Sequence, residues 1–316
     1  MKSVLSLLLL CLFATSGYSQ TDQKNPYGKL APTPNSKTKK HDFGKAASAE
    51  IYKQASNSDL WIYRFDPPKF EPGKDKRPAA VFFFGGGWKG GNITQFQQHA
   101  QYLASRGMVT FVADYRVKNR QQTDPDAAVA DGKSAIRWVR KNASRLGIDP
   151  KRIAAGGGSA GGHVAAATGM CDGLDEASEA KSPVSSKANA LLLYNPVYDN
   201  GPKGYGHDRV KKWFPAISPA HNISKDDPPT IVFLGSKDDL IPVATGEKFD
   251  KDLKAHGVRS EFHVYEGQGH GFFNDYKSKK SFLDTNLKSD AFLVSLGWLE
   301  GEADEKMLRS LLKKKK

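Results

Sequence analysis

Short apolar runs alternate with longer amphipathic segments along the chain from about residue 58 onward. The short runs are rich in β-branched and aromatic residues, which favours buried strands, and they span residues 60–65, 79–84, 109–113, 152–155, 190–194, 230–234 and 261–265. Helices are predicted from spacing and composition for residues 127–145, 159–168, 244–256 and 289–299. Strands that alternate with helices predict the α/β class, with a mostly parallel central sheet covered by helices on both faces.

Two polar stretches, residues 172–187 and 198–227, are long for plain connections. Long loops at the carboxyl ends of parallel strands commonly shape a binding site. The second stretch is expected to form part of a substrate wall, because it holds four ring-bearing side chains, Tyr205, His207, Trp213 and Phe214. We see no internal repeat and no second domain boundary in the sequence.

The first 19 residues have the pattern of a secretory signal peptide. Lys2 precedes an apolar run at residues 4–13, which is too short to span a bilayer comfortably, and small residues lead to a cleavage site near Ser19. We therefore expect export to the periplasm or the extracellular space, with no stable membrane anchor. The sequence further predicts a polar N-terminal arm at residues 20–57, the folded domain at 58–300 and a basic C-terminal tail at 301–316.

Composition narrows the classes of protein to consider. The 316 residues are 39% hydrophobic and 26% charged, which argues against a disordered chain, a collagen-like repeat and a polytopic membrane protein. The two cysteines, Cys11 and Cys171, rule out a disulfide scaffold and a Cys-rich zinc module. The formal net charge is +13, and the basic ends are interpreted as solvated tails or as a handle for acidic polysaccharide or an anionic membrane surface. Nucleic acid is not an expected partner, because an exported chain has no such role and no binding motif is present.

The strongest chemical signal is residues 157–161 (GGSAG), which match G-x-S-x-G around Ser159. In this motif a tight strand-to-helix turn strains the backbone of the serine and exposes its hydroxyl at the sheet edge. An apolar strand precedes it and a helix-forming run follows, as the motif requires. Residues 156–161 also match the dinucleotide fingerprint G-x-G-x-x-G. That motif needs a second strand ending in an acidic residue, and residues 165–188 contain no strand-like run.

A serine hydroxyl is a poor nucleophile unless a base takes its proton. In folds built on this motif the chain order is serine, acid, histidine. Asp238 and Asp239 follow the strand at 230–234, and His270 lies between glycines after the strand at 261–265. We favour Asp238 as the acid, with Asp239 capping the next helix, and His270 as the base.

Two further expectations concern the surroundings of Ser159. His163 lies one helical turn beyond the serine and is expected to pack or to position the helix. An oxyanion hole needs N–H donors aimed where negative charge develops. Gly86 and Gly87, directly after the strand at 79–84, can turn their N–H groups inward, and Ala160 supplies the N–H that follows the nucleophile.

With these segments assembled, the chain resembles the α/β-hydrolase superfamily, and in particular the esterase branch with hormone-sensitive-lipase-like carboxylesterases and bacterial acetylxylan and feruloyl esterases. The resemblance covers about residues 58–300 and implies an α/β-hydrolase fold in which Ser159, Asp238 and His270 form a catalytic triad. One departure is Phe84, where lipase-like members have a histidine that orients the glycine loop. The resemblance depends on FGGGW (84–88), DYR (114–116), GGSAGGH (157–163), SKDDLIP (236–242) and GHGF (269–272).

The sequence thus predicts a secreted serine carboxylesterase, with acetyl or feruloyl groups on polysaccharide as the first substrate guess. No metal or organic cofactor is implied, since HExxH, EF-hand and Walker patterns are missing. A prolyl-oligopeptidase-type peptidase is one alternative, although the chain has no room for the large extra domain of that class. A non-catalytic carbohydrate-binding relative is another, although such relatives typically lose a triad member. The acyl group, the alcohol and the oligomeric state are left open.

Overall fold

The computed structural model describes residues 40–44, 47–55 and 58–312, so the expected signal peptide and most of the expected arm lie outside the described residues. The strands are β1 (Ser48–Ala55), β2 (Ser58–Phe65), β3 (Arg77–Phe83), β4 (Val109–Ala113), β5 (Ile148–Gly158), β6 (Ala190–Tyr194), β7 (Thr230–Gly235) and β8 (Ser260–Tyr265). The helices are α1 (Gln97–Ser105), α2 (Lys118–Gln121), α3 (Pro125–Lys141), α4 (Ala160–Met170), α5 (His207–Val210), α6 (Val243–Ala255), α7 (Lys279–Ser295) and α8 (Glu305–Ser310), with short 3-10 helices at Ile93–Phe96 and Pro219–His221.

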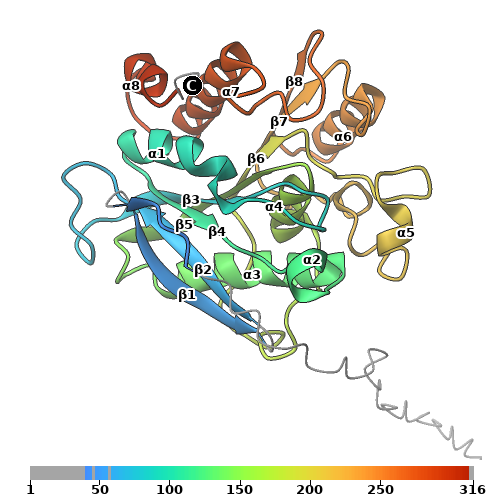
Figure 1. Cartoon of the computed structure of the whole chain (residues 1–316), viewed down its shortest axis with the longest axis horizontal. Helices are drawn as coiled ribbons and strands as arrows, with labels where there is room; N and C mark the ends of the chain where they lie inside the picture. The colour runs from blue at the N-terminus through green and yellow to red at the C-terminus, as the bar shows by residue number, and fades with distance from the viewer. Residues whose placement is uncertain (1–39, 45–46, 56–57, 313–316) are drawn as a thin grey trace, which may run out of the picture. The chain divides into compact units, whose positions relative to one another are not determined.

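The strands form one sheet in the order β1-β2-β4-β3-β5-β6-β7-β8 (Figure 1). The β1–β2 and β2–β4 pairs are antiparallel, and every pair from β4 to β8 is parallel. This arrangement confirms the predicted α/β fold with a mostly parallel sheet.

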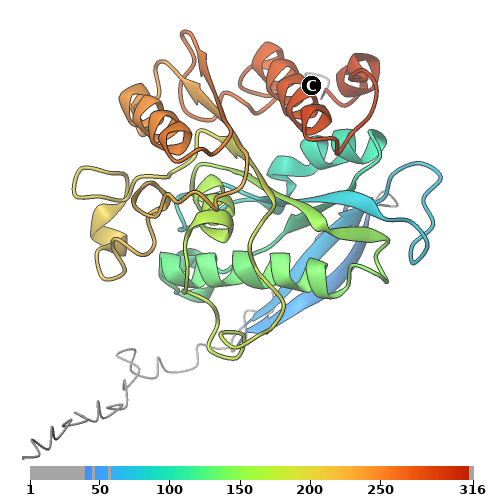
Figure 2. The same ribbon diagram turned by 180° about the vertical axis from the view of Figure 1, so that it is seen from behind.

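The core has two layers, one on each face of the sheet. Alternate side chains of β3 show the division: Val81 and Phe83 belong to the cluster that includes Val164 of α4, whereas Phe82 belongs to the cluster that includes Phe282 of α7. Helices α1, α7 and α8 therefore cover one face, and α3, α4 and α6 cover the other (Figures 1 and 2). The strands between these layers read as continuous apolar runs because both of their faces are buried.

The folded region extends beyond both predicted boundaries. Strand β1 lies inside the predicted arm. The sequence did not reveal it because an edge strand with one covered face keeps mostly polar side chains. Tyr52 of this strand is buried, and its hydroxyl donates to the Asp114 carbonyl at 2.6 Å. In the predicted tail, Asp304 caps α8, and Leu308 is fully buried against the α1–α7 side of the core. The predicted limits of 58 and 300 were therefore wrong at both ends.

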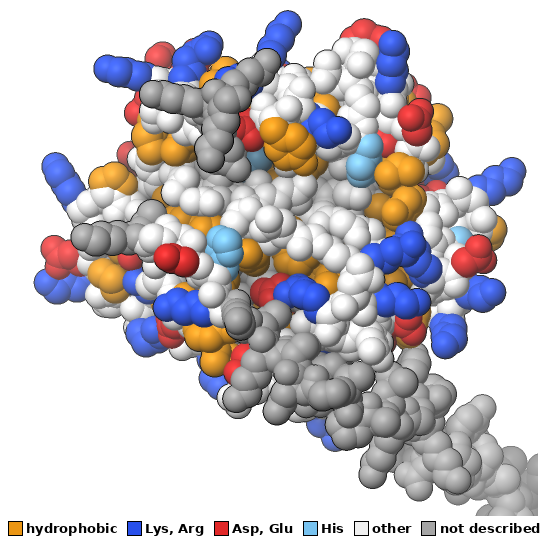
Figure 3. All heavy atoms as spheres, viewed as in Figure 1, with side chains coloured by type: hydrophobic (Ala, Val, Ile, Leu, Met, Phe, Trp, Pro, Cys, Tyr) orange, Lys and Arg blue, Asp and Glu red, His pale blue; other side chains and the backbone are white. Residues whose placement is uncertain are grey.

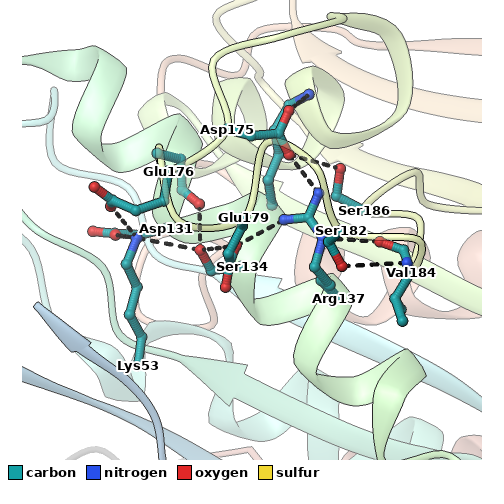
Figure 4. Close-up of polar contacts among 12 residues, drawn as sticks. Lys53, Asp131, Ser134, Arg137, Asp175, Glu176, Glu179, Ser182, Val184 and Ser186 are labelled. Carbon is teal, nitrogen blue, oxygen red and sulfur yellow. Dashed lines mark hydrogen bonds and ion pairs between the residues drawn. The ribbon is translucent and has the colours of Figure 1, made fainter.

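The first polar stretch, residues 172–187, does not shape the site. It joins the end of α4 to the start of β6, which places it at the edge of the sheet where the parallel strands begin. Ion pairs fasten it to α3 and β1 (Figure 4): Arg137 pairs with Glu179 at 2.7 Å and with Asp175, and Lys53 pairs with Glu176 at 2.6 Å. Its polar composition thus serves attachment rather than ligand binding.

The site lies at the opposite edge, where the parallel strands end. The register aligns Phe83 with Gly157, Gly158 with Tyr194, and Tyr194 with Phe233. The residues that follow these strands therefore meet at one edge.

Positive and negative side chains are mixed on the face of the molecule that Figure 3 shows. On the face shown in Figure 3, Lys and Arg side chains project around the outline with Asp and Glu among them, rather than in one basic patch. Within the part of the chain that the structure describes, no helix is both long and apolar enough to cross a membrane.

Candidate active site

Ser159 occupies the turn between β5 and α4, with a strained backbone of φ 54° and ψ −121°. The glycines around it are required by space. A Cβ on Gly157 would lie 2.4 Å from the Gly161 carbonyl oxygen, and a Cβ on Gly161 would lie 2.2 Å from that of Phe83. The turn can therefore fold back on itself and approach the end of β3 this closely only because both positions are glycine.

The structure brings Ser159, His270 and Asp238 into one hydrogen-bonded chain. His270 Nε2 lies 2.9 Å from Ser159 Oγ, and His270 Nδ1 lies 2.8 Å from Asp238 Oδ2. Since the carboxylate accepts the proton of Nδ1, the Nε2 lone pair is left to accept the serine proton. The three residues come from three separate loops at the carboxyl ends of β5, β7 and β8.

Asp238 is held in place by backbone N–H groups of the residues that follow it in the loop. Its side chain is fully buried, and its Oδ1 accepts from the N–H groups of Leu240 and Ile241, both at 2.9 Å. Asp239 is exposed and does not cap α6, because that helix begins only at Val243 after an N-cap without a side-chain bond. The expected capping role of Asp239 was therefore wrong.

Asn195 is part of this arrangement, although it was not selected from the sequence. It directly follows β6, and its Oδ1 accepts the Gly271 N–H at 2.8 Å while its Nδ2 lies 3.4 Å from His270 Nε2. Asn195 thus supports the loop that carries the imidazole. Its position just after a buried parallel strand was the signal that could have identified it.

The glycine loop of residues 85–87 lies against the serine, since a Cβ on Gly85 would be 3.3 Å from the Ser159 Cβ. The Gly85 N–H donates to Gln95 Oε1 at 2.6 Å, whereas the N–H groups of Gly86 and Gly87 find no acceptor among the described residues. Ala160 is the first residue of α4, where an N–H has no partner inside the helix. Three N–H groups beside the serine are thus available to bind an anion.

Phe84 occupies the position at which lipase-like proteins have a histidine, and its side chain anchors the glycine loop by packing. Its ring stacks on that of Tyr115 with centroids 4.2 Å apart, and the Tyr115 hydroxyl donates to the Phe84 carbonyl at 2.6 Å. Burial raises the pKa of Tyr115 well above its usual range, so the phenol keeps its proton and remains a donor. The start of the glycine loop is therefore anchored without a histidine.

His163 packs as expected. Its Nε2 donates to the Ile217 carbonyl at 2.8 Å, and its ring meets Trp88 edge-on at 5.0 Å. Burial lowers the pKa of His163 to about 4, so the imidazole is neutral. His163 thus attaches the second polar stretch to α4.

A cavity of 420 Å³ opens above the serine, and a neighbouring cavity of 320 Å³ shares four of its lining residues. Of the four ring-bearing side chains expected in the substrate wall, Tyr205 lines the larger cavity, and His207, Trp213 and Phe214 do not. The second cavity is lined mainly by amides, hydroxyls and a carboxylate, among them Asn92, Gln98 and Asp275. Tyr276, 72% exposed, lies on the wall common to both.

The chain is similar to known esterases. The BD-FAE family model matches residues 68–198. Esterase LipC of Mycobacterium tuberculosis is 30% identical over 236 residues, which cover 68% of this chain and 56% of that protein. The probable isoprenylcysteine alpha-carbonyl methylesterase ICMEL1 of Oryza sativa is 28% identical over 217 residues, which cover 61% of this chain and 51% of that protein. The chain thus spans little more than half the length of these curated relatives.

Solved structures of esterase 2 of Thermogutta terrifontis resemble most of this chain. The native form superposes with a TM-score of 0.78 at 41% identity and covers 82% of this chain and 96% of that one. The same esterase is described phosphorylated by paraoxon, with a TM-score of 0.76, 41% identity, and coverage of 82% and 97%.

Proposed function

Because this chain belongs to the α/β-hydrolase family of carboxylesterases, we propose that it is a serine carboxylesterase with Ser159 as its nucleophile. The observation that supports this most directly is the continuous contact from Asp238 through His270 to the Ser159 hydroxyl, at 2.8 and 2.9 Å. In this proposal His270 is the general base and Asp238 holds the imidazole in the tautomer that accepts at Nε2.

The reaction has two halves. Ser159 Oγ attacks the ester carbonyl carbon while His270 Nε2 takes the hydroxyl proton; the tetrahedral intermediate then releases the alcohol, to which His270 returns that proton. Water next attacks the acyl-serine by the same route, and the carboxylic acid leaves with Ser159 restored. Each half moves one proton through one imidazole, so no external oxidant, reductant or co-reactant other than water is needed.

The N–H groups of Gly86, Gly87 and Ala160 are proposed to bind the oxygen that becomes negative. A donor of this kind contributes about 3 kcal/mol to lowering the barrier. The positive end of the α4 dipole lies at the same place, because Ala160 is the first residue of that helix. The organophosphate adduct described for the Thermogutta esterase supports a nucleophile of this type, since such agents react with activated hydroxyls.

The direct test is Ser159→Ala with a short p-nitrophenyl ester and a serine-directed fluorophosphonate. We expect kcat/KM to fall by more than about 1,000-fold and the label to disappear. Ser310→Ala, a change at an exposed serine of α8, is the matched control and should behave as the wild type. Hydrolysis near the wild-type rate after Ser159→Ala would exclude the proposed nucleophile.

We further propose that the alcohol part of the substrate belongs to a polysaccharide. The neighbouring cavity supports this, because amide and carboxylate groups suit sugar hydroxyls and the exposed Tyr276 ring at its edge offers a flat apolar surface to a sugar. Acetylated xylan, methyl ferulate and p-nitrophenyl acetate should be compared by kcat/KM. Release of acetate from xylan is the expected result; activity on small aryl esters alone would restrict the proposal to simple carboxylesterase activity.

Export is proposed from the apolar run near the N-terminus, which lies outside the described residues. The measurement is N-terminal sequencing of the protein recovered from the periplasm or the medium, with a start near Gln20 as the expected result. Recovery from the cytoplasm with residues 1–19 intact would contradict it.

A further inference from the structure

We propose that Arg209 is a positioning residue that holds the glycine loop in the conformation needed for catalysis, an inference that rests on the proposed function. Arg209 lies on α5, in the second polar stretch, far along the chain from the glycine loop. Its Nη1 donates to the Gly87 carbonyl oxygen at 2.5 Å. The contact joins the loop that binds the developing charge to a segment with no part in the triad.

The guanidinium itself packs over two neighbouring aromatic rings. Its central carbon lies 5.0 Å from the ring centroid of Trp88 and 5.0 Å from that of Tyr205. No carboxylate among the described residues lies within ion-pair distance of Arg209, so its charge is directed to the two rings and to the Gly87 carbonyl. Cation–π attraction to both rings favours the orientation in which the guanidinium reaches the Gly87 carbonyl oxygen.

The glycine loop needs such an attachment because its backbone is intrinsically free. Gly86 and Gly87 have φ values of +139° and +61°, and Trp88 follows with +58°. Glycine adopts many conformations at small cost, so its own chemistry does not keep an N–H aimed at a substrate. Contacts from outside the loop must therefore select this conformation.

Other contacts fix two peptide planes before Gly87, the one that carries the Gly85 N–H and the one that carries the Gly87 N–H, and Arg209 binds the plane after Gly87. Gln95 holds the Gly85 N–H, and the Gly86 carbonyl accepts from the N–H groups of Lys89 and Gly90 at 3.1 and 3.2 Å. The Gly86 carbonyl shares a plane with the Gly87 N–H, one of the two proposed donors of the loop. The Gly87 carbonyl, on the other side of that residue, is the group that Arg209 binds, so both planes around Gly87 are held only when Arg209 is present.

The space around the contact is filled. A Cβ on Gly87 would lie 3.1 Å from the Tyr205 hydroxyl and 3.5 Å from Arg209 Nη1, and a Cβ on Gly206 would lie 2.8 Å from the Trp88 ring. Tyr205 also lines the cavity above Ser159. Arg209 therefore connects one wall of the cavity with the glycine loop. Changes in this wall should influence kcat as well as substrate binding.

The test compares Arg209→Met and Arg209→Lys with Arg145→Met as the matched control. Arg145 is also stacked on a tryptophan, 5.6 Å from the Trp138 ring, but it pairs with Glu50 and belongs to no part of the site. With p-nitrophenyl acetate we expect Arg209→Met to lower kcat by about 10- to 100-fold with KM changed by less than about threefold, because a loop displaced by about 1 Å loses oxyanion binding in the transition state. Arg209→Lys should recover only part of kcat, since an ammonium lacks the planar fork.

A second measurement separates positioning from loss of folding. Arg209→Ala, treated with methylguanidinium, should regain kcat in a saturable way, while the thermal midpoints of the Arg209 variants stay near that of Arg145→Met. Wild-type kcat in Arg209→Met, a rise in KM alone, or a rate loss that only follows loss of folded protein would overturn the proposal. A wild-type enzyme inactive on every ester and unlabelled by fluorophosphonate would instead contradict the proposed function.

Discussion

Replacing His99 by phenylalanine should make the protein less sensitive to acid. His99 of α1 is 1% exposed and packs against the rings of Phe96, Phe282 and Tyr194 at centroid distances of 4.8, 5.0 and 5.2 Å. It also borders the smaller cavity beside the active site. Neither of its ring nitrogens has a hydrogen-bond partner among the described residues. A phenyl ring of similar size suits this environment better than an imidazole that must stay neutral.

The size of the effect follows from the pKa of the imidazole. Burial lowers the pKa of His99 from the usual 6.5 to about 3, so between these values the unfolded chain binds a proton that the folded protein does not. Stability is therefore full above pH 6.5 and falls as the pH decreases toward 3. At pH 5 the loss from His99 is about 2 kcal/mol, and His163, whose pKa burial lowers to about 4, loses a similar amount, about 2 kcal/mol.

Urea unfolding at pH 7.5 and pH 5.0 measures this difference. Wild type should lose about 4 kcal/mol from the two histidines, and His99→Phe should lose about 2 kcal/mol less while matching or exceeding the wild type at pH 7.5. The exposed His256 supplies the control, because His256→Gln should leave the pH-dependent loss unchanged. An equal loss in His99→Phe and wild type would show that the buried imidazole is not a source of acid sensitivity.

Two further predictions concern the acid of the triad and the ion pairs of Figure 4. Asp238→Asn should lower kcat by about 10⁴-fold because the amide stabilises the wrong imidazole tautomer, whereas Asp239→Asn should stay within about twofold; the reverse order in a p-nitrophenyl acetate assay would assign the acid to Asp239. Arg137→Met should cost about 2 kcal/mol of unfolding free energy, since Glu179 loses its ion-pair partner and Asp175 keeps only Lys133 at 3.6 Å, while both carboxylates are partly buried. The kcat of Arg137→Met should not change, because the pairs lie at the other edge of the sheet; an unchanged urea midpoint would refute their stabilising role.

The sequence was sufficient to predict those parts of the fold and of the site that local pattern and sheet topology determine together. Apolar runs and the G-x-S-x-G turn specify the central strands and the place of Ser159, and the ends of parallel strands meet at one edge in any sheet of this class. That rule is enough to expect Asp238 and His270 near the serine from three distant segments. Their contacts, at 2.8 and 2.9 Å, depend on loop conformations that no periodicity specifies.

The residues that escaped sequence reasoning lie where tertiary contacts decide the structure. Strand β1 looks polar because only one of its faces is covered, and its pairing with β2 supplies what its composition does not. Arg209 lies in a long irregular stretch, and its bond to Gly87 spans 122 positions in the chain. A lone arginine in a loop has no spacing that relates it to a glycine turn so far away.

Three of the six non-glycine residues with positive φ in the described part of the chain lie at the site, and the bonds around them explain how their strain persists. Ser159, Asn195 and Trp88 have φ values of 54°, 34° and 58°, each costing about 1–3 kcal/mol for a residue with a side chain. The Ser159 N–H donates to the Tyr194 carbonyl at 3.0 Å, the Asn195 N–H donates to that of Phe233 at 2.7 Å, and the Trp88 carbonyl accepts from Lys118 at 2.9 Å. Two of these three bonds anchor the strained residue to the buried end of a neighbouring strand, so relaxing the turn would break a bond where water cannot replace it. The sheet thus stabilises the loops in the conformation that the proposed chemistry needs, and a substitution that frees one of these bonds should reduce kcat before it reduces substrate binding.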